Sequence, residues 1–373
     1  MNSRILFLLH LPPPVHGSSM VGEYIKNSGK IKKEFSCRFI DMGTSRTTGE
    51  VGKGGIMKPL RYMGVLVRVI FTLMRFRPQV CYMAIAATGP AFYKDTLVAL
   101  LLRASGANII YHFHNKGVRT KQKNRIDDLL YSKVFKDAKA ILLSPYLYHD
   151  VEKYFAENKV FYCPNGVPEI ASKASVVKRG KRGITEILFL SNLIASKGIL
   201  DLLEAVKILK ARGLDFHLTV VGGEGDVDRN MLRESLLKLG IEDLVTYVGK
   251  KFGAEKKEIF LNADIFAFPT YYHYECFPLV LLEAMQYSLP VVSTFEGGIP
   301  EIVDNGETGL LVNQRDIEGI ADKLEYLIKN PEIRRSMGEK GNERYENNFT
   351  LSTFENRITE ILREVAAPVT PSA

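Results

Sequence analysis

The stretch YECFPLVLLEAM, residues 274–285, places two glutamates, Glu275 and Glu283, at either end of a nearly unbroken apolar run. Carboxylates are rarely buried without a partner, so each of them needs a polar group to face. Pro278 suits the first turn of a helix, where its missing N–H costs nothing. The stretch therefore predicts a helix that begins at Pro278, buries the run 279–282 and leaves its first N–H groups open.

A helix start of this kind is an anion site, because its free N–H groups and its dipole both favour negative charge. Glu275 lies just before the helix, and Glu283 lies about one and a half turns inside it. Both carboxylates can accept hydrogen bonds from hydroxyl groups on either side of a bound anion. A diphosphate flanked by hydroxyl-rich groups is a nucleotide sugar, and that is the ligand this stretch predicts.

The rest of the chain alternates short apolar runs with helical patterns. Continuous apolar strands that are each followed by a helix are typical of parallel sheets covered on both faces. We therefore expect an α/β protein of two doubly wound domains facing across a cleft, with ligands at the carboxyl ends of the strands. The expected strands are 4–10, 37–41, 79–86, 108–113, 139–144, 159–163, 185–190, 216–221, 244–248, 264–268, 290–294 and 309–312. The expected helices are 18–28, 59–77, 93–104, 124–136, 145–156, 198–212, 226–239, 254–262, 278–287 and 351–366.

The basic, glycine-interrupted segment KRGKRG at 178–183 has the composition of a linker. Its position predicts an N-terminal domain over residues 1–178 and a C-terminal domain over residues 184–350. The last helix, 351–366, is expected to pack back on the N-terminal domain.

The charge of the chain is divided unevenly between its halves. Residues 1–183 hold 30 Lys and Arg against 12 Asp and Glu, whereas residues 184–373 hold 20 against 30. A half this basic indicates an anionic partner, such as nucleic acid, phospholipid or a phosphorylated substrate, or a surface tuned for solubility. The acidic half argues against a nucleic-acid-binding protein, and no helix-turn-helix, aromatic RNA motif or zinc spacing appears.

The cysteines and the first residues indicate a cytoplasmic protein. The four cysteines are far apart and lie in or beside apolar runs, which predicts reduced, mostly buried thiols and no structural zinc. The apolar part of RILFLLHLPPP, residues 4–14, is too short for a signal peptide and ends in prolines.

The segment 59–77 has the length of a membrane span, but Arg61, Arg68 and Arg75 recur every seven residues and so share one helix face. Each arginine near a bilayer centre costs about 2.5–3.5 kcal/mol, so a transmembrane helix is rejected. Two interpretations stay open: a helix packed on the first sheet with its arginines at the surface, or contact of the basic stripe with an anionic membrane surface.

The second half of the chain resembles a known family. It looks like the donor domain of glycosyltransferase family 4 in several segments. They are the Glu-x7-Glu pair, ILFLSNLIASKGILDLLEA, LTVVGGEGD, VTYVGKK, ADIFAFPTYYHYECFPLVLLEAM and the segment ending in ETGLLV. The members of that family are retaining enzymes with the GT-B fold of two Rossmann-like domains. The similarity covers nearly all of 184–349. The first half is similar more loosely, through PPPVHGSS at 12–19, HFHNKG at 112–117 and PNGV at 164–167.

The resemblance implies roles for several residues of the second half. Lys197 matches the lysine that neutralises the donor diphosphate, Glu275 the glutamate that holds hydroxyls of the transferred sugar, and Glu283 the one that binds the nucleotide ribose. Lys250 and Lys251 match positions that contact the base, mostly through main chain. The main-chain N–H groups of the helix start would meet the diphosphate at Phe277, Leu279 and Val280, which Pro278 cannot do.

In the first half, the resemblance assigns Gly17 to the loop where a missing side chain lets the backbone approach the phosphates. His114 matches the histidine that reaches the sugar near the reaction centre. His112 is the alternative, and we expect it to point to the other face of its strand.

One position departs from the family pattern. Asn192 stands where an arginine often supplies a second cation for the diphosphate. Asparagine donates hydrogen bonds but carries no charge, so Lys197 and the helix start must stabilise more of the leaving group. A cation from the basic loop 116–125 could replace the arginine; otherwise turnover is modest.

The resemblance implies transfer of a hexosyl or N-acetylhexosaminyl group from a nucleoside-diphosphate sugar, with UDP preferred, to a hydroxyl of a glycan or lipid-linked acceptor. Such a reaction would serve cell-surface polysaccharide synthesis, at the cytoplasmic face of the membrane. No Asp-x-Asp dyad suited to a divalent metal appears, so we expect no metal or other cofactor. The alternatives are a nucleotide-sugar-binding protein without transferase activity and an epimerase of the same fold.

Overall fold

The computed structural model describes residues 2–43, 57–170 and 183–367 of the 373-residue chain. These residues form two compact units: unit 1 is Met1–Gly166 with Leu351–Ala373, and unit 2 is Val167–Thr350. The division falls earlier in the chain than the expected boundary at 178. Apart from Gly183, the expected linker at 178–183 lies outside the described residues.

Unit 1 is built on a six-stranded sheet with the order β2-β1-β3-β4-β5-β6. All neighbouring strands are parallel; Ile5, for example, lies opposite Cys37 on one side and Val80 on the other. The strands are β1 (Arg4–Leu9), β2 (Ser36–Asp41), β3 (Val80–Ile85), β4 (Asn108–Phe113), β5 (Lys139–Leu142) and β6 (Val160–Tyr162). Every residue of β3 is buried, as expected for a strand covered on both faces.

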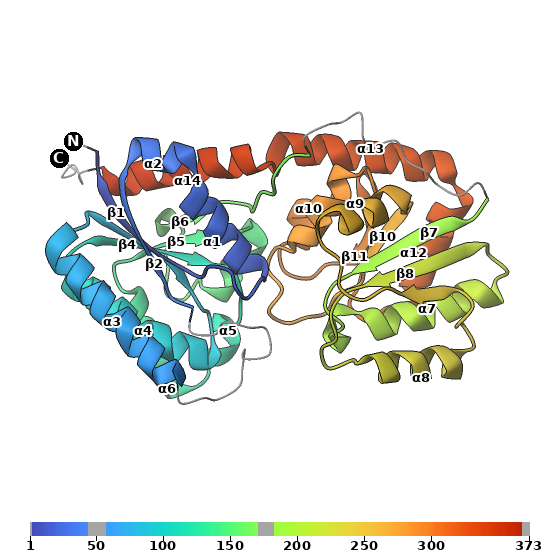
Figure 1. Ribbon diagram of the computed structural model, residues 1–373, viewed down its shortest axis with the longest axis horizontal. Coiled ribbons are helices and arrows are strands. Elements are labelled where there is room, and N and C mark those ends of the chain that lie inside the picture. Colours follow the sequence, from blue (N-terminus) through green and yellow to red (C-terminus); the bar gives the residue numbers. More distant parts are fainter. Residues whose placement is uncertain (1, 44–56, 171–182, 368–373) are drawn as a thin grey trace. The chain divides into compact units, whose positions relative to one another are not determined.

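Helices lie on both faces of this sheet (Figure 1). They are α1 (Gly17–Asn27), α2 (Gly29–Glu34), α3 (Met57–Phe76), α4 (Gly89–Ala104), α5 (Val118–Lys121), α6 (Arg125–Phe135) and α14 (Leu351–Ala366). The layer of α3, α4 and α6 packs on the sheet through a core that includes Val69, Phe92 and Phe135. The last helix, α14, contacts α2, β3 and β4, so the end of the chain completes unit 1.

The predicted helix at 145–156 is only partly correct. The structure has 3-10 turns there, at Pro145–Asp150 and Glu157–Lys159. No helix in the described part of the chain is long and apolar enough to cross a membrane.

Unit 2 repeats the architecture with a parallel six-stranded sheet of order β12-β11-β10-β7-β8-β9. Its strands are β7 (Thr185–Leu190), β8 (Phe216–Val221), β9 (Val245–Tyr247), β10 (Ile265–Phe268), β11 (Val291–Thr294) and β12 (Gly309–Val312). Its helices are α7 (Ile199–Ala211), α8 (Arg229–Leu239), α9 (Gly253–Asn262), α10 (Leu279–Gln286), α11 (Ile299–Ile302), α12 (Ile317–Lys329) and α13 (Pro331–Asn348), with a 3-10 turn at Ala195–Lys197. All twelve predicted strands are thus present in the two sheets.

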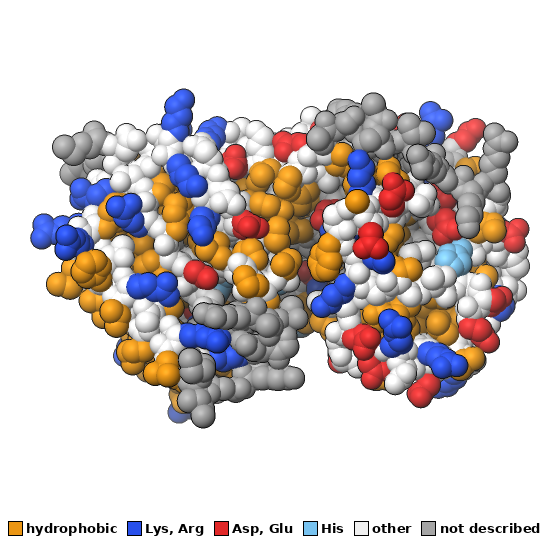
Figure 2. Space-filling model, viewed as in Figure 1, with side chains coloured by type: hydrophobic (Ala, Val, Ile, Leu, Met, Phe, Trp, Pro, Cys, Tyr) orange, Lys and Arg blue, Asp and Glu red, His pale blue; other side chains and the backbone are white. Residues whose placement is uncertain are grey.

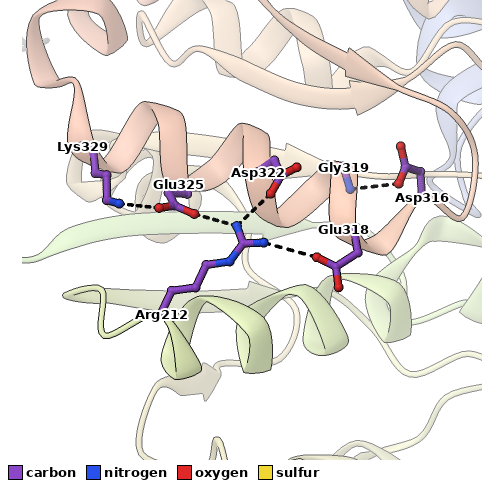
Figure 3. A network of polar contacts seen from close by, with 7 residues as sticks. All are labelled: Arg212, Asp316, Glu318, Gly319, Asp322, Glu325 and Lys329. Carbon is purple, nitrogen blue, oxygen red and sulfur yellow. Dashed lines mark hydrogen bonds and ion pairs between the residues drawn. The ribbon is translucent and has the colours of Figure 1, made fainter.

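Helices α7 and α12 are joined by a network of charges (Figure 3). Arg212 follows α7, and its guanidinium lies 2.8 Å from Asp322, 2.6 Å from Glu325 and 3.2 Å from Glu318, all on α12. The first turn of α12 is capped separately, because Gly319 N–H donates to Asp316 Oδ1 at 2.9 Å.

Unit 2 begins and ends at the same place. Val167 N–H donates to the carbonyl of Phe349 at 3.1 Å, and Val167 forms an isolated parallel bridge with Thr350. Gln286 and Tyr345 hold the same corner through hydrogen bonds to the carbonyls of Pro168 and Val167, respectively. The two points where the chain enters and leaves this unit are therefore side by side.

Candidate functional site

Helix α10, which follows the TYYHYECF segment, has the predicted extent to within a residue. It begins at Leu279, and Pro278 is its N-cap with extended backbone rather than its first helical residue. The expectation that the helix buries the run 279–282 is only partly correct: Leu281 and Leu282 are buried, whereas Leu279 and Val280 are partly exposed. Within the described residues, no side chain caps the first turn of α10. The N–H groups of Leu279 and Val280 therefore lie at a helix start that has no side-chain cap.

Lys197 and Glu275 are in direct contact. The ammonium of Lys197 forms an ion pair with Glu275 Oε2, and both side chains are largely buried. The same ammonium lies 4.3 Å from the ring centroid of Tyr272, within the range of a cation–π contact. Because Glu275 N–H donates to Tyr272 O at 2.8 Å, one short turn presents both the carboxylate and the ring to the lysine.

The loop that carries Lys197 is fixed by backbone contacts. Tyr271 N–H donates to Ser196 O at 2.8 Å. Gly198 has φ +87°, and a Cβ there would lie 2.1 Å from the carbonyl oxygen of Pro269. Only glycine fits both the left-handed backbone and the close approach, so this position sets the geometry of the lysine.

Glu283 has a partner that the sequence did not indicate. Lys256, on α9, places its ammonium 2.7 Å from both carboxylate oxygens of Glu283. Each of these two side chains is about a quarter exposed, so the pair can be reached from solvent. The ion pair fixes Glu283 without burying it.

The remaining positions predicted in unit 2 lie at the carboxyl ends of β7 and β9. Asn192 is exposed in the loop after β7, and its carbonyl accepts a hydrogen bond from Ile194 N–H at 2.8 Å. Lys250 lies across Gly223, where an added Cβ would be 1.9 Å from the lysine Cε. Lys251 is paired with Glu255 at 2.5 Å.

Phe277 is buried, and its ring packs edge-on against Phe349 with centroids 5.8 Å apart. Its side chain therefore anchors the turn before α10, and only its backbone can contribute to an anion site. Gly297 supports the same turn, since its φ is +57° and a Cβ would lie 2.3 Å from the carbonyl oxygen of Glu275.

Gly17 and His114 lie in unit 1. Gly17 is the first residue of α1, where an added Cβ would meet no atom within 4 Å. Side-chain packing therefore does not require a glycine at this position. The glycine leaves room for another group at this helix start. The preceding residue, His16, is the N-cap and accepts a hydrogen bond from Ser19 N–H at 3.3 Å.

The expectation that His112 and His114 point to opposite faces is wrong. Their rings are 4.1 Å apart. Side chains in a strand alternate with a period of two, so residues two apart share a face. His112 is instead distinguished by its partner, because its Nδ1 lies within hydrogen-bond distance of the Tyr82 hydroxyl in the core.

Burial keeps His10 and His114 of unit 1 neutral. The pKa of His114 is lowered to about 3, chiefly by burial and to a smaller extent by the neighbouring His16. Burial likewise lowers the pKa of His10, at the end of β1, to about 3. His114 Nδ1 is buried without a hydrogen-bond partner among the described residues. A neutral imidazole there can donate or accept a hydrogen bond but supplies no positive charge at pH 7.

The structure thus brings Lys197 and Glu275 together, holds Glu283 separately through Lys256, and places Gly17 and His114 in the other unit. Sequence reasoning missed Tyr272, Gly297 and Lys256. Tyr272 could have been found, because it lies three residues before Glu275 in an aromatic-rich turn. The helical pattern of residues 254–262 does not indicate which carboxylate Lys256 faces.

Comparison with known proteins shows what the chain is similar to. Residues 173–344 match the family model described as "Glycosyl transferases group 1". The whole chain has the GT-B fold: it matches a sucrose-phosphate synthase from Thermosynechococcus elongatus with a TM-score of 0.73 and 18% identity, over 98% of this chain and 99% of that one. The HepE protein of Anabaena, solved with UDP-glucose, matches with a TM-score of 0.73 and 17% identity, over 97% of this chain and 99% of that one.

Among curated proteins, the chain is similar to the capsular polysaccharide biosynthesis glycosyltransferase CapM of Staphylococcus aureus. The two are 31% identical over 162 residues, which are 43% of this chain and 41% of CapM. The match therefore spans less than half of that relative. The residues that match the glycosyltransferase group 1 model, 173–344, lie within unit 2.

Proposed function

We propose that the protein is a retaining glycosyltransferase, which moves a hexosyl or N-acetylhexosaminyl group from a nucleoside-diphosphate sugar to a hydroxyl of a glycan or lipid-linked acceptor. The observation that carries the proposal is the contact between Lys197 and Glu275 beside the uncapped start of α10. The contact lies within residues that match the glycosyltransferase group 1 model. The similarity to CapM supports the proposal of a role in cell-surface polysaccharide synthesis.

In the proposed donor complex, the diphosphate lies at the start of α10 and takes Lys197 as its counterion. Glu275 then exchanges its ion pair for hydroxyl groups of the sugar, and Glu283 accepts hydrogen bonds from the ribose. Phosphate favours a helix start because several N–H groups converge there. UDP is the preferred nucleotide, supported by the UDP-glucose complex of the structurally similar HepE.

During transfer, the bond between the anomeric carbon and the diphosphate oxygen breaks, and a bond to the acceptor oxygen forms on the same face of the sugar. The acceptor proton passes to the leaving phosphate oxygen. Negative charge grows on the diphosphate as positive charge develops on the sugar ring. Lys197 and the helix start are held in place before the reaction, so they stabilise that charge without reorganising. His114, as a neutral imidazole, can hold a sugar hydroxyl.

The proposal needs no metal, because a lysine and a helix start supply the positive charge that a divalent cation would otherwise provide. Transfer is therefore expected to continue in EDTA. Complete loss of activity in EDTA, restored by a divalent cation, would show that this part of the proposal is wrong.

The decisive experiment screens the purified chain against a panel of nucleotide sugars, first by thermal shift and then by release of nucleoside diphosphate. Lys197→Met is expected to lower kcat about 10²–10³-fold, because it removes the only side-chain cation proposed at the leaving group. The matched control is Lys207→Met, which changes an exposed lysine on α7 and is expected to leave kcat unchanged. Donor turnover that survives Lys197→Met would refute the proposal.

A further inference from the structure

The outer surface of one helix layer in unit 1 is unusually apolar. On α3, α4 and α6, large apolar side chains that point away from the sheet are between 41% and 72% exposed. They are Leu60, Met63, Val67, Ile70, Phe71 and Met74 on α3, Tyr93, Leu97 and Leu100 on α4, and Ile126 and Leu129 on α6. We call this set the α3 face. In Figure 2 apolar side chains follow the line of α3 along the edge of unit 1.

Helix α3 is apolar on two opposite sides. Val65 and Val69 face the sheet and are fully buried, with Leu66 and Leu73 packed beside them. The exposed apolar residues of α3 lie within about 100° of arc on the other side. A surface helix normally exposes a polar face, so a second apolar stripe indicates that something else covers it.

The neighbouring helices extend the stripe into a surface. Helix α3 contacts α4, and α4 contacts α6. The exposed residues of α4 and α6 follow helical spacing, with Leu97 and Leu100 three apart and Ile126 and Leu129 three apart. The α3 face is therefore broad, and not a narrow groove suited to a single peptide helix.

Helix α3 carries lysine and arginine but no acidic residue. Arg68, Arg75 and Arg125 are exposed on the same helices. The acidic residues of α4 and α6 do not oppose them: Asp95 and Asp127 are buried.

The third acidic residue, Asp128, is already paired with Lys153 at 2.5 Å. Arg75 also stacks on the apolar stripe itself, with its guanidinium 5.6 Å from the ring of Phe71. The stripe and its cations thus form one surface.

We propose that the α3 face docks on a bilayer that contains anionic phospholipids, with α3 lying in the plane of the interface. The exposed apolar side chains enter the boundary of headgroups and acyl chains, while the arginines bind lipid phosphates. A second copy of the chain is a poorer occupant, because it would bring two sets of arginines together. The inference goes beyond sugar transfer and does not depend on it.

The test is flotation of the purified chain with vesicles of phosphatidylcholine alone or mixed with phosphatidylglycerol, at low and high salt. The chain is expected to float with the anionic vesicles at low salt and to be released by high salt. Arg68→Glu with Arg75→Glu is expected to weaken binding roughly tenfold or more. Val67→Ser with Phe71→Ser leaves the cations in place and is expected to weaken binding at low salt, because it removes the apolar contact.

Unit 2 offers matched controls on the surface of α8. Met231 and Leu237 are exposed apolar residues there, and Arg233 and Lys238 are exposed cations. Met231→Ser with Leu237→Ser, and Arg233→Glu with Lys238→Glu, make the same chemical changes away from the α3 face. Both controls are expected to bind vesicles as the unchanged chain does.

A second measurement uses the absence of tryptophan from the chain. Phe71→Trp introduces a single tryptophan in the α3 face, and its emission is expected to shift to the blue when anionic vesicles are added. Leu237→Trp reports from α8 and is expected to show no shift. Circular dichroism of each variant verifies that it is folded.

Three outcomes would overturn the proposal. The first is no flotation of the unchanged chain with anionic vesicles at low salt. The second is equal loss of binding in the α3 and α8 variants. The third is a dimer in light scattering that Val67→Ser with Phe71→Ser converts to a monomer, since the α3 face would then be covered by a second copy of the chain.

Discussion

Units 1 and 2 share a six-stranded parallel sheet covered by helices, but they place their polar groups differently. In unit 2 the functional charges are paired with one another: Lys197 with Glu275, and Lys256 with Glu283. In unit 1 the polar groups at the strand ends include histidines that burial keeps neutral, His10 and His114. The same sheet architecture can therefore hold polar side chains either by ion pairs or by burial of neutral groups. The two kinds of site should respond differently to mutation, pH and salt.

The largest expected effect concerns the independence of the two units. Ile358, on α14, is fully buried in unit 1, so Ile358→Ala is expected to lower the free energy of unfolding of that unit by about 2–5 kcal/mol. Hydrogen–deuterium exchange, followed peptide by peptide, should show faster exchange in β3 and β4 and unchanged exchange in unit 2.

Two variants serve as controls for that experiment. Ile320→Ala removes an equally buried side chain from α12 and is expected to affect unit 2 instead. Glu364→Ala changes an exposed residue of α14 and is expected to have no effect. Equal destabilisation of both units by Ile358→Ala would show that they unfold as one.

The second prediction concerns acid. His10 and His114 of unit 1 have pKa values of about 3 in the folded chain, below the usual value of 6.5 that they regain on unfolding. Between those values the unfolded chain binds more protons, so stability falls as the pH is lowered through about 6. The slope is at most about 1.4 kcal/mol per histidine per pH unit. Thermal unfolding measured from pH 7.5 down to pH 5 gives this slope. His10→Asn should reduce the slope by the contribution of one histidine.

Unit 2 provides the contrast in the same titration. Its site is held by ion pairs between carboxylates and lysines, and not by buried histidines. Exchange in unit 1 should therefore rise before exchange in unit 2 as the pH falls. A slope that His10→Asn does not change would contradict the assignment to buried histidines.

The third prediction tests whether Lys256 positions Glu283 for the ribose. Under the proposed function, Lys256→Met should raise the KM for the donor about threefold to tenfold, equivalent to about 1 kcal/mol, and change kcat little. Lys256→Arg keeps the charge and should restore most of the affinity. Initial rates at varied donor concentration separate the two constants. A fall in kcat at constant KM would mean that the pair acts on the transition state instead.

The smallest expected effect is at Arg212. Its network with Asp322, Glu325 and Glu318 is at the surface, where solvent weakens ion pairs. Arg212→Ala should lower the melting temperature slightly at low salt, because three carboxylates of α12 lose their shared cation. High salt should abolish the difference. A large loss that is insensitive to salt would indicate that packing of the arginine stem dominates.

The sheets were predictable from the sequence because their strands are continuous apolar runs, as in VCYMAI of β3. Helix α13 was not predicted, for a physical reason. Its sequence is polar, and two of its buried positions are glycines, Gly338 and Gly341. A Cβ at Gly338 would lie 2.1 Å from the carbonyl oxygen of Ser288, so this helix packs by backbone approach, which leaves no apolar periodicity to find.

The positions of the site were predictable to a similar degree. The spacing of Glu275 and Glu283 and the nearby proline indicated the helix start, and the structure has it within one residue. The ion pairs were not predictable, because they join residues far apart in the chain, such as Lys197 with Glu275 and Lys256 with Glu283. The roles of these residues in catalysis stay predictions until the donor experiments are done.

The β-bridge between Val167 and Thr350 makes the chain suitable for exchange of a whole unit. Unit 2 is an insertion whose two ends form a ready-made closed junction, so a cassette of residues 167–350 can be cut out without leaving distant loose ends. Replacing it with the corresponding cassette from a relative would exchange one half of the protein and leave the other half continuous through α14. Recombination of this kind makes two chain junctions, and both lie at the same place in the fold.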